Sequence, residues 1–271
     1  MMPRFPWSRL SALRGALFAL APLLLLAPGA RALEPGEFDP ARFDALLMKY
    51  VADGRVDYAA WKSGGVAELD AFLDSLAVYD LGSVMGKEPR ASFLLNAYNA
   101  WVVRQVLDHY PVKSVKDIPG FFDKNTRKIA GEERTLDGIE TALAELLPHR
   151  PEFALALCTG AIGGPALLET AYRSDIFEPM IAKTLRGTFQ RKRIRYDPAA
   201  NEVHCPPEVD RYMDRYKALP QGILSAFSSH LTLSEVIALN TKQPKFVVDP
   251  VDWSLNEIPP HRTDPNGVKA P

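Results

Sequence analysis

The chain has 271 residues and a formal net charge of −1 at pH 7, from 32 basic and 33 acidic side chains. The two signs are interspersed, which excludes a dedicated nucleic-acid-binding surface, because such a surface needs a basic excess. About 240 residues remain beyond the N-terminal segment described next, enough for one domain with a continuous core.

Residues 1–32 have the pattern of a secretory signal peptide. Three arginines precede an apolar run over residues 16–27, and Ala30-Arg31-Ala32 offers a cleavage site. An uncleaved membrane anchor is the alternative, but the run is shorter than the roughly 20 residues of a span, and prolines interrupt it. We therefore expect a periplasmic or secreted protein that starts at Leu33 and meets a membrane only during export.

The mature chain is predicted to form one domain over residues 33–258, followed by a polar, proline-rich and disordered tail at 259–271. Apolar periodicity and turn signals predict helices and short strands that do not alternate regularly. The expected helices cover residues 41–51, 66–77, 90–109, 136–147, 175–190, 219–227 and 233–240. The expected extended pieces cover 55–58, a hairpin at 128–135, and strands at 153–157, 193–196, 202–204 and 245–248. This content predicts an α+β fold, a single mainly helical domain with a small sheet of short strands.

Two charged groups are interpreted as solvent-facing. The basic cluster at residues 191–195 leads into a predicted strand and is typical of a solvated edge rather than a phosphate or membrane site. The acidic residues Glu132, Glu133, Glu140 and Glu145 are expected on the surface of the hairpin and of the helix after it.

The long helix before Pro111 carries two asparagines, Asn96 and Asn99, three positions apart and hence on one face. Asparagine is a poor helix former, and its amide must be hydrogen-bonded among apolar neighbours. We expect these amides either to fix neighbouring backbone or to orient a ligand, and the two roles are compatible.

Four segments carry a family resemblance: GRVDYAAW (54–61), NAYNAWVVRQVLDHYPVKSVKDI (96–118), FALALCTGAIGGPALLETAY (153–172) and DWSLN (252–256). In order and spacing they resemble the hallmarks of the domain-of-unknown-function 547 family (DUF547). The resemblance implies a site where the asparagine helix, the 153–157 strand and the loop after it meet. Typical members have a histidine before that strand and two cysteines after it. Here Glu152 replaces the histidine, Gly164 replaces the second cysteine, and Cys158 matches the first only with a one-residue shift.

Cys158 and Cys205 either form a disulfide or remain free thiols. Cys158 precedes a glycine-rich loop, a junction where nucleophiles are often displayed and where the amides of Gly163 and Gly164 could face an oxyanion. A base would have to come from a histidine elsewhere, with His204 and His230 among the candidates. The alternative for Cys158 is a small, inert core residue.

Asp252 and Trp253 place an acid and an indole on one loop close to Asn256. They can bind a ligand, or else Trp253 pins the loop by burial while Asp252 caps a turn. The histidines and cysteines lack the spacing of metal ligands, so no metal site and no cofactor are predicted.

Two functions are compatible with these residues. One is a papain-like or transglutaminase-like thiol hydrolase or acyl transferase on a peptide or amide, with Cys158 as nucleophile and a papain-like or transglutaminase-like form of the α+β fold. The other is a non-catalytic family member that binds a small molecule, peptide or protein, and the departures at Glu152 and Gly164 favour it. Redox chemistry through Cys158 and Cys205 is a third alternative.

Overall fold

The computed structural model describes residues 38–259, all within the unit Leu33–Pro271. The predicted signal peptide and the predicted tail beyond residue 259 fall outside the described residues. Within this range helices predominate and the strands are short, which confirms the α+β prediction. No helix within the described range combines the length and the apolar character that crossing a membrane requires.

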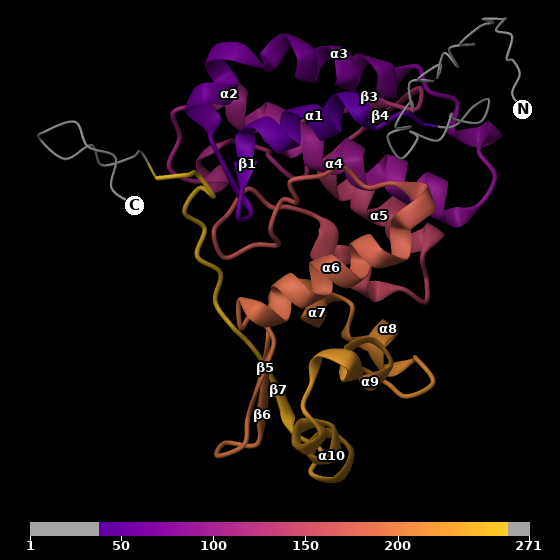
Figure 1. Ribbon diagram of the computed structural model, residues 1–271, viewed down its shortest axis with the longest axis vertical. Coiled ribbons are helices and arrows are strands. Elements are labelled where there is room, and N and C mark those ends of the chain that lie inside the picture. Colours follow the sequence, from indigo (N-terminus) through magenta and orange to yellow (C-terminus); the bar gives the residue numbers. More distant parts are fainter. Residues whose placement is uncertain (1–37, 260–271) are drawn as a thin grey trace, which may run out of the picture. The chain divides into compact units, whose positions relative to one another are not determined.

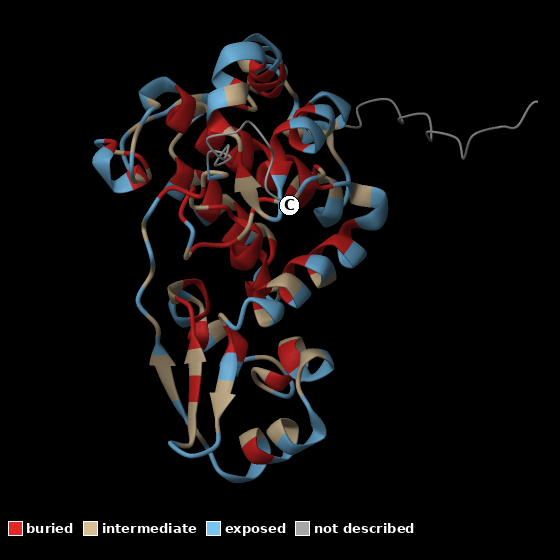
Figure 2. Ribbon diagram, turned by 60° about the vertical axis from the view of Figure 1, so that its left-hand side comes forward, coloured by how far each residue is buried: buried red, intermediate tan, exposed pale blue. Residues whose placement is uncertain are grey.

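The helical part of the domain is built around α4 (Lys87–His109), which is buried over most of its length (Figure 2). Its sequence is apolar nearly all round, so it needs partners on several sides. Those partners are α2 (Tyr58–Gly64), α3 (Val66–Ala77) and α5 (Leu136–Leu146), with α1 (Ala41–Tyr50) packed on α3 (Figure 1). The helix ends before Pro111, as predicted, because a residue that precedes proline is held out of helical geometry.

Local signals in the first half of the domain give the structures they predict. Thr135 caps α5 by accepting a hydrogen bond from the Gly138 backbone N–H at 3.0 Å. Strands β3 (Arg127–Ile129) and β4 (Glu132–Arg134) form the predicted hairpin, and its two turn residues, Ala130 and Gly131, both have positive φ.

The second half of the domain contains a three-stranded sheet of order β5-β6-β7. Strand β6 (Glu202–Cys205) is the central one, antiparallel to β5 (Arg195–Asp197) and parallel to β7 (Lys245–Val248). The chain returns from β6 to β7 through several helices: α7 (Pro207–Arg211), α8 (Met213–Lys217), α9 (Leu224–Phe227) and α10 (Leu233–Thr241). In the sequence, α6 (Phe177–Gln190) precedes the sheet. Near the start of the domain, β1 (Val51–Ala52) pairs with β2 (Arg55–Val56).

Several predictions about elements are wrong in whole or in part: Tyr58 starts α2 instead of ending an extended piece, and the strand predicted at 193–196 is Arg195–Asp197. Residues 153–157 are not a strand: Pro151–Ala156 form a 3₁₀ helix, because Pro151 fixes a helical φ at its first position and a short apolar run cannot distinguish strand from helix. The helix predicted from residue 219 begins only at Leu224, after Pro220 and Gly222, whose φ is positive. The helix predicted from residue 175 begins at Phe177, after a 3₁₀ turn.

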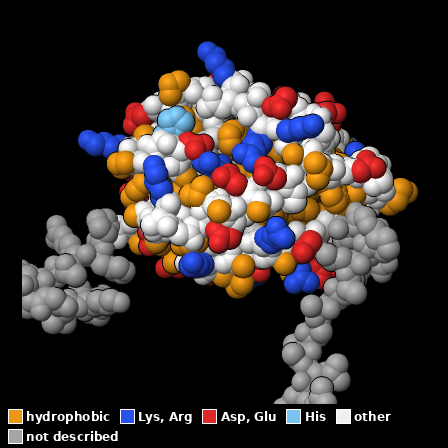
Figure 3. All heavy atoms as spheres, turned by 90° about the horizontal axis from the view of Figure 1, so that it is seen from above, with side chains coloured by type: hydrophobic (Ala, Val, Ile, Leu, Met, Phe, Trp, Pro, Cys, Tyr) orange, Lys and Arg blue, Asp and Glu red, His pale blue; other side chains and the backbone are white. Residues whose placement is uncertain are grey.

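Charges of both signs are interspersed over the face drawn in Figure 3. Two residues whose side chains are expected to face solvent are instead largely buried. Glu140 is only 7% exposed. The side chain of Arg193 is 12% exposed and pairs with Glu208 at 2.8 Å. Each finds an opposite charge from a distant part of the chain, which no local pattern could indicate.

Candidate functional site

Asn96 and Asn99 are buried and act on backbone. The Asn96 side chain donates to the Tyr172 carbonyl and accepts from the Tyr172 N–H, both at 2.8 Å. The Asn99 side chain donates to the Ala156 carbonyl at 3.1 Å and accepts from the Cys158 N–H at 2.9 Å. Each amide thus satisfies one buried donor and one buried acceptor, and α4 fixes the positions of two loop segments.

The Cys158 thiol lies in a buried polar network. Its sulfur is 3.4 Å from the Gly160 backbone nitrogen and 3.6 Å from Asn256 Nδ2, while Asn256 Oδ1 accepts from the Tyr58 hydroxyl at 2.8 Å. Only 1% of Cys158 is exposed. Burial disfavours the thiolate more strongly than these donors favour it, and it raises the pKa of Cys158 to about 11.

The two cysteines are both free and both buried, so the disulfide alternative is not realised in this structure. Burial and nearby carboxylates raise the pKa of Cys205 to about 11 as well. Among the described residues, the groups that hydrogen-bond Cys158 sulfur come from Gly160, Leu167 and Asn256, and none is a histidine.

The candidate bases lie in other surroundings. His204 Nδ1 is 2.8 Å from Asp249 Oδ1, in the three-stranded sheet. His230 stacks on Phe189 with ring centroids 5.1 Å apart. Its partial burial and the nearby Arg186 lower the pKa of His230. These two histidines are held by partners of their own rather than by the thiol.

The C-terminal segment that carries Asp252 and Trp253 runs across the glycine-rich loop. Isolated β-bridges join Ser254 to Ser114, Leu255 to Ala161 and Glu257 to Val56. Asp252 Oδ1 accepts from the Ser254 N–H at 2.9 Å, which lowers the pKa of Asp252. Asp252 therefore forms the turn-capping contact that its position suggested.

Gly163 and Gly164 allow this close approach. A methyl group on Gly163 would stand 2.5 Å from the Asp252 backbone nitrogen, and one on Gly164 would stand 1.9 Å from Thr159 Oγ1. That threonine hydroxyl is buried and has no hydrogen-bond partner within residues 38–259. In this structure the glycines provide room for neighbouring atoms, which is a packing role.

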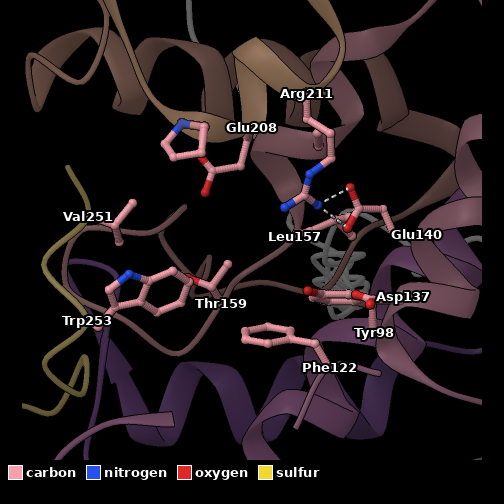
Figure 4. Close-up of a pocket in the computed structure, with 12 residues that line it drawn as sticks. Tyr98, Phe122, Asp137, Glu140, Leu157, Thr159, Glu208, Arg211, Val251 and Trp253 are labelled. Carbon is pink, nitrogen blue, oxygen red and sulfur yellow. Dashed lines mark hydrogen bonds and ion pairs between the residues drawn. The ribbon is translucent and has the colours of Figure 1, made fainter. Parts of the chain in front are cut away.

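Beside the loop lies a cavity of about 260 Å³ (Figure 4). Its walls come from distant parts of the chain and combine aromatic, aliphatic and charged side chains. They are Tyr98, Phe122, Asp137, Glu140, Ala154, Leu157, Thr159, Pro207, Glu208, Arg211, Val251 and Trp253. Trp253 meets Phe122 edge to face at 6.2 Å, and the exposed Lys116 ammonium lies 4.3 Å from the Trp253 ring centroid.

Charged residues of the cavity are mostly paired. Arg211 Nη1 donates to both carboxylate oxygens of Glu140 at 2.7 Å, and the Tyr212 hydroxyl donates to Glu140 Oε1 at 2.9 Å. Figure 4 shows this pair on the side opposite Trp253. Glu208 pairs with Arg193 from outside the cavity.

The segment from Leu157 to Thr159 is the wall between the cavity and the thiol. Leu157 and Thr159 line the cavity, and Cys158 between them does not. Leu157 has an extended backbone, with φ −92° and ψ 98°, so successive side chains point to opposite sides. The Cys158 side chain consequently faces the Tyr58 and Asn256 network.

Glu152, at the position where the family resemblance expects a histidine, is 8% exposed and accepts from Arg150 Nε at 2.5 Å. It is not among the residues that line the cavity. No group of three or more His, Cys, Asp or Glu within the described part of the chain is arranged to hold a metal ion.

Sequence reasoning found Trp253 but missed most of the cavity, including Tyr98, Phe122, Asp137, Glu140, Glu208 and Arg211. One signal was available for Tyr98, which lies between the two asparagines of α4. Asp137 and Glu140 on α5 and Glu208 and Arg211 on α7 come together only through packing of these two helices against the 3₁₀ helix Pro151–Ala156.

Comparison with known proteins gives one family. Residues 83–186 match the model of the family described as "Protein of unknown function, DUF547", which confirms the family resemblance. The matched stretch contains both asparagines, Cys158 and one part of the cavity wall, and it ends before Pro207, Glu208, Arg211, Val251 and Trp253, which form the rest. Neither the curated proteins nor the solved structures contain a match to this chain.

Proposed function

Because residues 83–186 match the DUF547 family model, we propose that the chain is an exported, non-catalytic binding module. Its ligand, a small molecule or a side chain of a peptide or protein, occupies the cavity between Trp253 and the Glu140–Arg211 pair. A concave site with mostly apolar walls and a few placed polar groups is the usual form of a ligand site.

The observation that carries this proposal is the orientation of the wall. Leu157 and Thr159 contribute to the cavity, while the intervening Cys158 sulfur is held on the other side by Asn256 and Gly160. A nucleophilic thiol needs a lowered pKa and access to its substrate. Burial raises the pKa of Cys158 instead, to about 11, and no cysteine is among the residues that line the cavity.

Thiol labelling tests the non-catalytic part of the proposal. In a Cys205→Ser variant, so that Cys158 is the remaining thiol, iodoacetamide alkylation is followed from pH 6 to pH 11. With a pKa of about 11, about one Cys158 in ten thousand is a thiolate at pH 7. We expect a very slow rate at neutral pH that rises about tenfold per pH unit. Rapid alkylation well below the ordinary thiol pKa of about 8.5 would support the thiol hydrolase instead.

Fragment binding tests the cavity. A library of small soluble fragments is screened by ligand-observed NMR against the wild type and two variants, Val251→Trp and Val248→Trp. Val251 lines the cavity, whereas Val248 is 42% exposed at the end of β7. We expect hits that disappear in Val251→Trp, because the larger ring fills the cavity, and that persist in Val248→Trp. Hits that are indifferent to both variants would place the binding site elsewhere.

Export is the remaining part of the proposal, and the arginine-flanked apolar run with its Ala30-Arg31-Ala32 motif supports it. Expression of the full chain in a bacterial host, followed by N-terminal sequencing of the periplasmic fraction, should give a first residue of Leu33. A full-length chain retained in the membrane fraction would instead indicate an uncleaved anchor.

A further inference from the structure

Three carboxylates and one guanidinium line the cavity, and they are not equally compensated. Glu140 is paired with Arg211, and Glu208 with Arg193. Asp137, in the first turn of α5, has no ion-pair partner among residues 38–259. One negative charge in the cavity wall is therefore left without a cation.

Asp137 is an exposed residue of the cavity wall, so a ligand that enters from solvent can reach its carboxylate, although that carboxylate has lost part of its water. Loss of water raises the pKa of the Asp137 carboxyl, Glu140 and Asp123 add to the rise, and Arg211 opposes it. The Arg211 guanidinium has both contacts of its Nη1 directed to Glu140. A positive group placed beside Asp137 would reduce the repulsion among the three carboxylates.

The rest of the wall is suited to an apolar or aromatic stem. Phe122 lies between Trp253 and the Asp137 side of the cavity in Figure 4. Aromatic rings attract cations through their faces, and Trp253 shows this already, with the Lys116 ammonium 4.3 Å from its ring centroid. A ring or short chain in the cavity would contact Leu157, Val251 and Phe122.

We propose that the cavity selects ligands with a single positive charge on a short aromatic or aliphatic stem, with the ammonium beside Asp137 and the stem between Phe122 and Trp253. This inference rests on the proposed function, since it names the class of ligand that the same cavity takes. A side chain such as lysine, presented by a peptide, has the same chemistry as a free amine.

An anion at Arg211 is the competing outcome. One guanidinium nitrogen of Arg211 is turned away from Glu140 in Figure 4 and could meet a carboxylate. An anion there would have to enter a wall that holds three carboxylates. The uncompensated charge is the negative one, and this favours the cation.

Three probes of nearly equal shape separate these outcomes: benzylamine, benzyl alcohol and benzoate, titrated into the mature protein by calorimetry at low ionic strength. We expect benzylamine to bind at least about tenfold more tightly than benzyl alcohol, and benzoate to bind most weakly. A tenfold ratio corresponds to about 1.4 kcal/mol, within the range of one partly exposed charge pair.

Two variants locate the charge. Asp137→Asn keeps the shape and removes the charge, and we expect it to abolish the preference for benzylamine over benzyl alcohol. Glu133→Gln makes the same change in net charge at an exposed position of β4, away from the cavity, and should leave the preference intact. A thermal melt of each variant confirms that it is folded.

The outcomes distinguish this inference from the proposed function. Tighter binding of benzoate, or a benzylamine preference that survives Asp137→Asn, overturns the cationic ligand while the cavity remains a binding site. Weak binding of all three probes, together with fragment hits that are lost in Val251→Trp, also overturns it. If neither probes nor fragments bind in the cavity, the proposed function itself fails.

Discussion

The two sides of the segment from Leu157 to Gly160 differ in how completely their polar groups are paired. On the core side, the Asn99 amide accepts from the Cys158 backbone N–H, and the Cys158 sulfur, Asn256 and Tyr58 form a buried chain of hydrogen bonds. On the cavity side, the Asp137 carboxylate lacks an ion-pair partner within the described residues. A side on which every polar group is hydrogen-bonded holds one conformation. A side with an unpaired carboxylate has a group that can still bind a ligand.

Because of this difference, the residues on the two sides have different roles, structural on the core side and ligand-binding on the cavity side. Asn96 and Asn99 act as the scaffold that holds the wall. Their amides bond backbone groups of the wall, and these groups are present whatever side chains the wall carries. The cavity side owes its properties to side chains from α5, α7 and the C-terminal segment. Substitutions on the core side should therefore cost stability, and substitutions on the cavity side should change it little.

The largest effect is expected for Asn99→Ala. The Ala156 carbonyl and the Cys158 N–H would both lose their partner in a buried place, and each such loss costs about 1–3 kcal/mol, so the free energy of unfolding should fall by about 2–6 kcal/mol. Urea unfolding measures it. Asn240→Ala is the control, because Asn240 is exposed and bonds its own helix at the Val236 carbonyl. Equal costs for the two variants would contradict the scaffold role.

An intermediate effect is expected for alanine at the two glycines of the loop, about 1–3 kcal/mol each, because a well-packed site must shift to admit a methyl group. The obstacle at Gly164 is the Thr159 side chain, whereas at Gly163 it is the Asp252 backbone. Adding Thr159→Ala should recover part of the loss in Gly164→Ala and none in Gly163→Ala, as measured by thermal unfolding. Recovery in both would show that the clash is not local.

The smallest effect is expected on the cavity side, for Glu140→Gln. It removes the charge that pairs with Arg211, but the Arg211 side chain is 55% exposed and can turn to water, so the cost should be about 1 kcal/mol. Glu145→Gln, an exposed position on the same helix, should cost less still. If Glu140→Gln destabilised the protein as much as Asn99→Ala, the cavity side would also be structural scaffold, and the contrast between the two sides would fail.

Much of the fold followed from local patterns. The face of α1 formed by Phe43, Leu46, Leu47 and Tyr50 is buried as its spacing predicts, and α3 has its predicted bounds. The N-cap at Thr135 and the hairpin around Gly131 also agree with prediction. These features depend on residues within a few positions of one another, so the sequence contains the whole cause.

The errors share a different origin. The run Phe153–Leu157 satisfied the pattern of a buried strand, but Asn99, 57 positions away from Ala156, supplies the partner that a neighbouring strand would have supplied. Glu140 was predicted to be solvated because its partner Arg211 is 71 positions away. Burial of a charge depends on where the opposite charge is brought, and no local window contains both.

The sequence by itself determined α3, α4 and α5, the cap at Thr135, the family resemblance and the two asparagines in an apolar helix, because propensity, capping and amphipathic spacing act over one or two turns. Only the tertiary structure decided that these amides hold backbone and that Cys158 faces the core while Leu157 and Thr159 face the cavity. It also decided that Asp137 has no ion-pair partner among the residues that the structure describes. Those facts depend on which distant segments pack together, and packing is set by the whole chain at once.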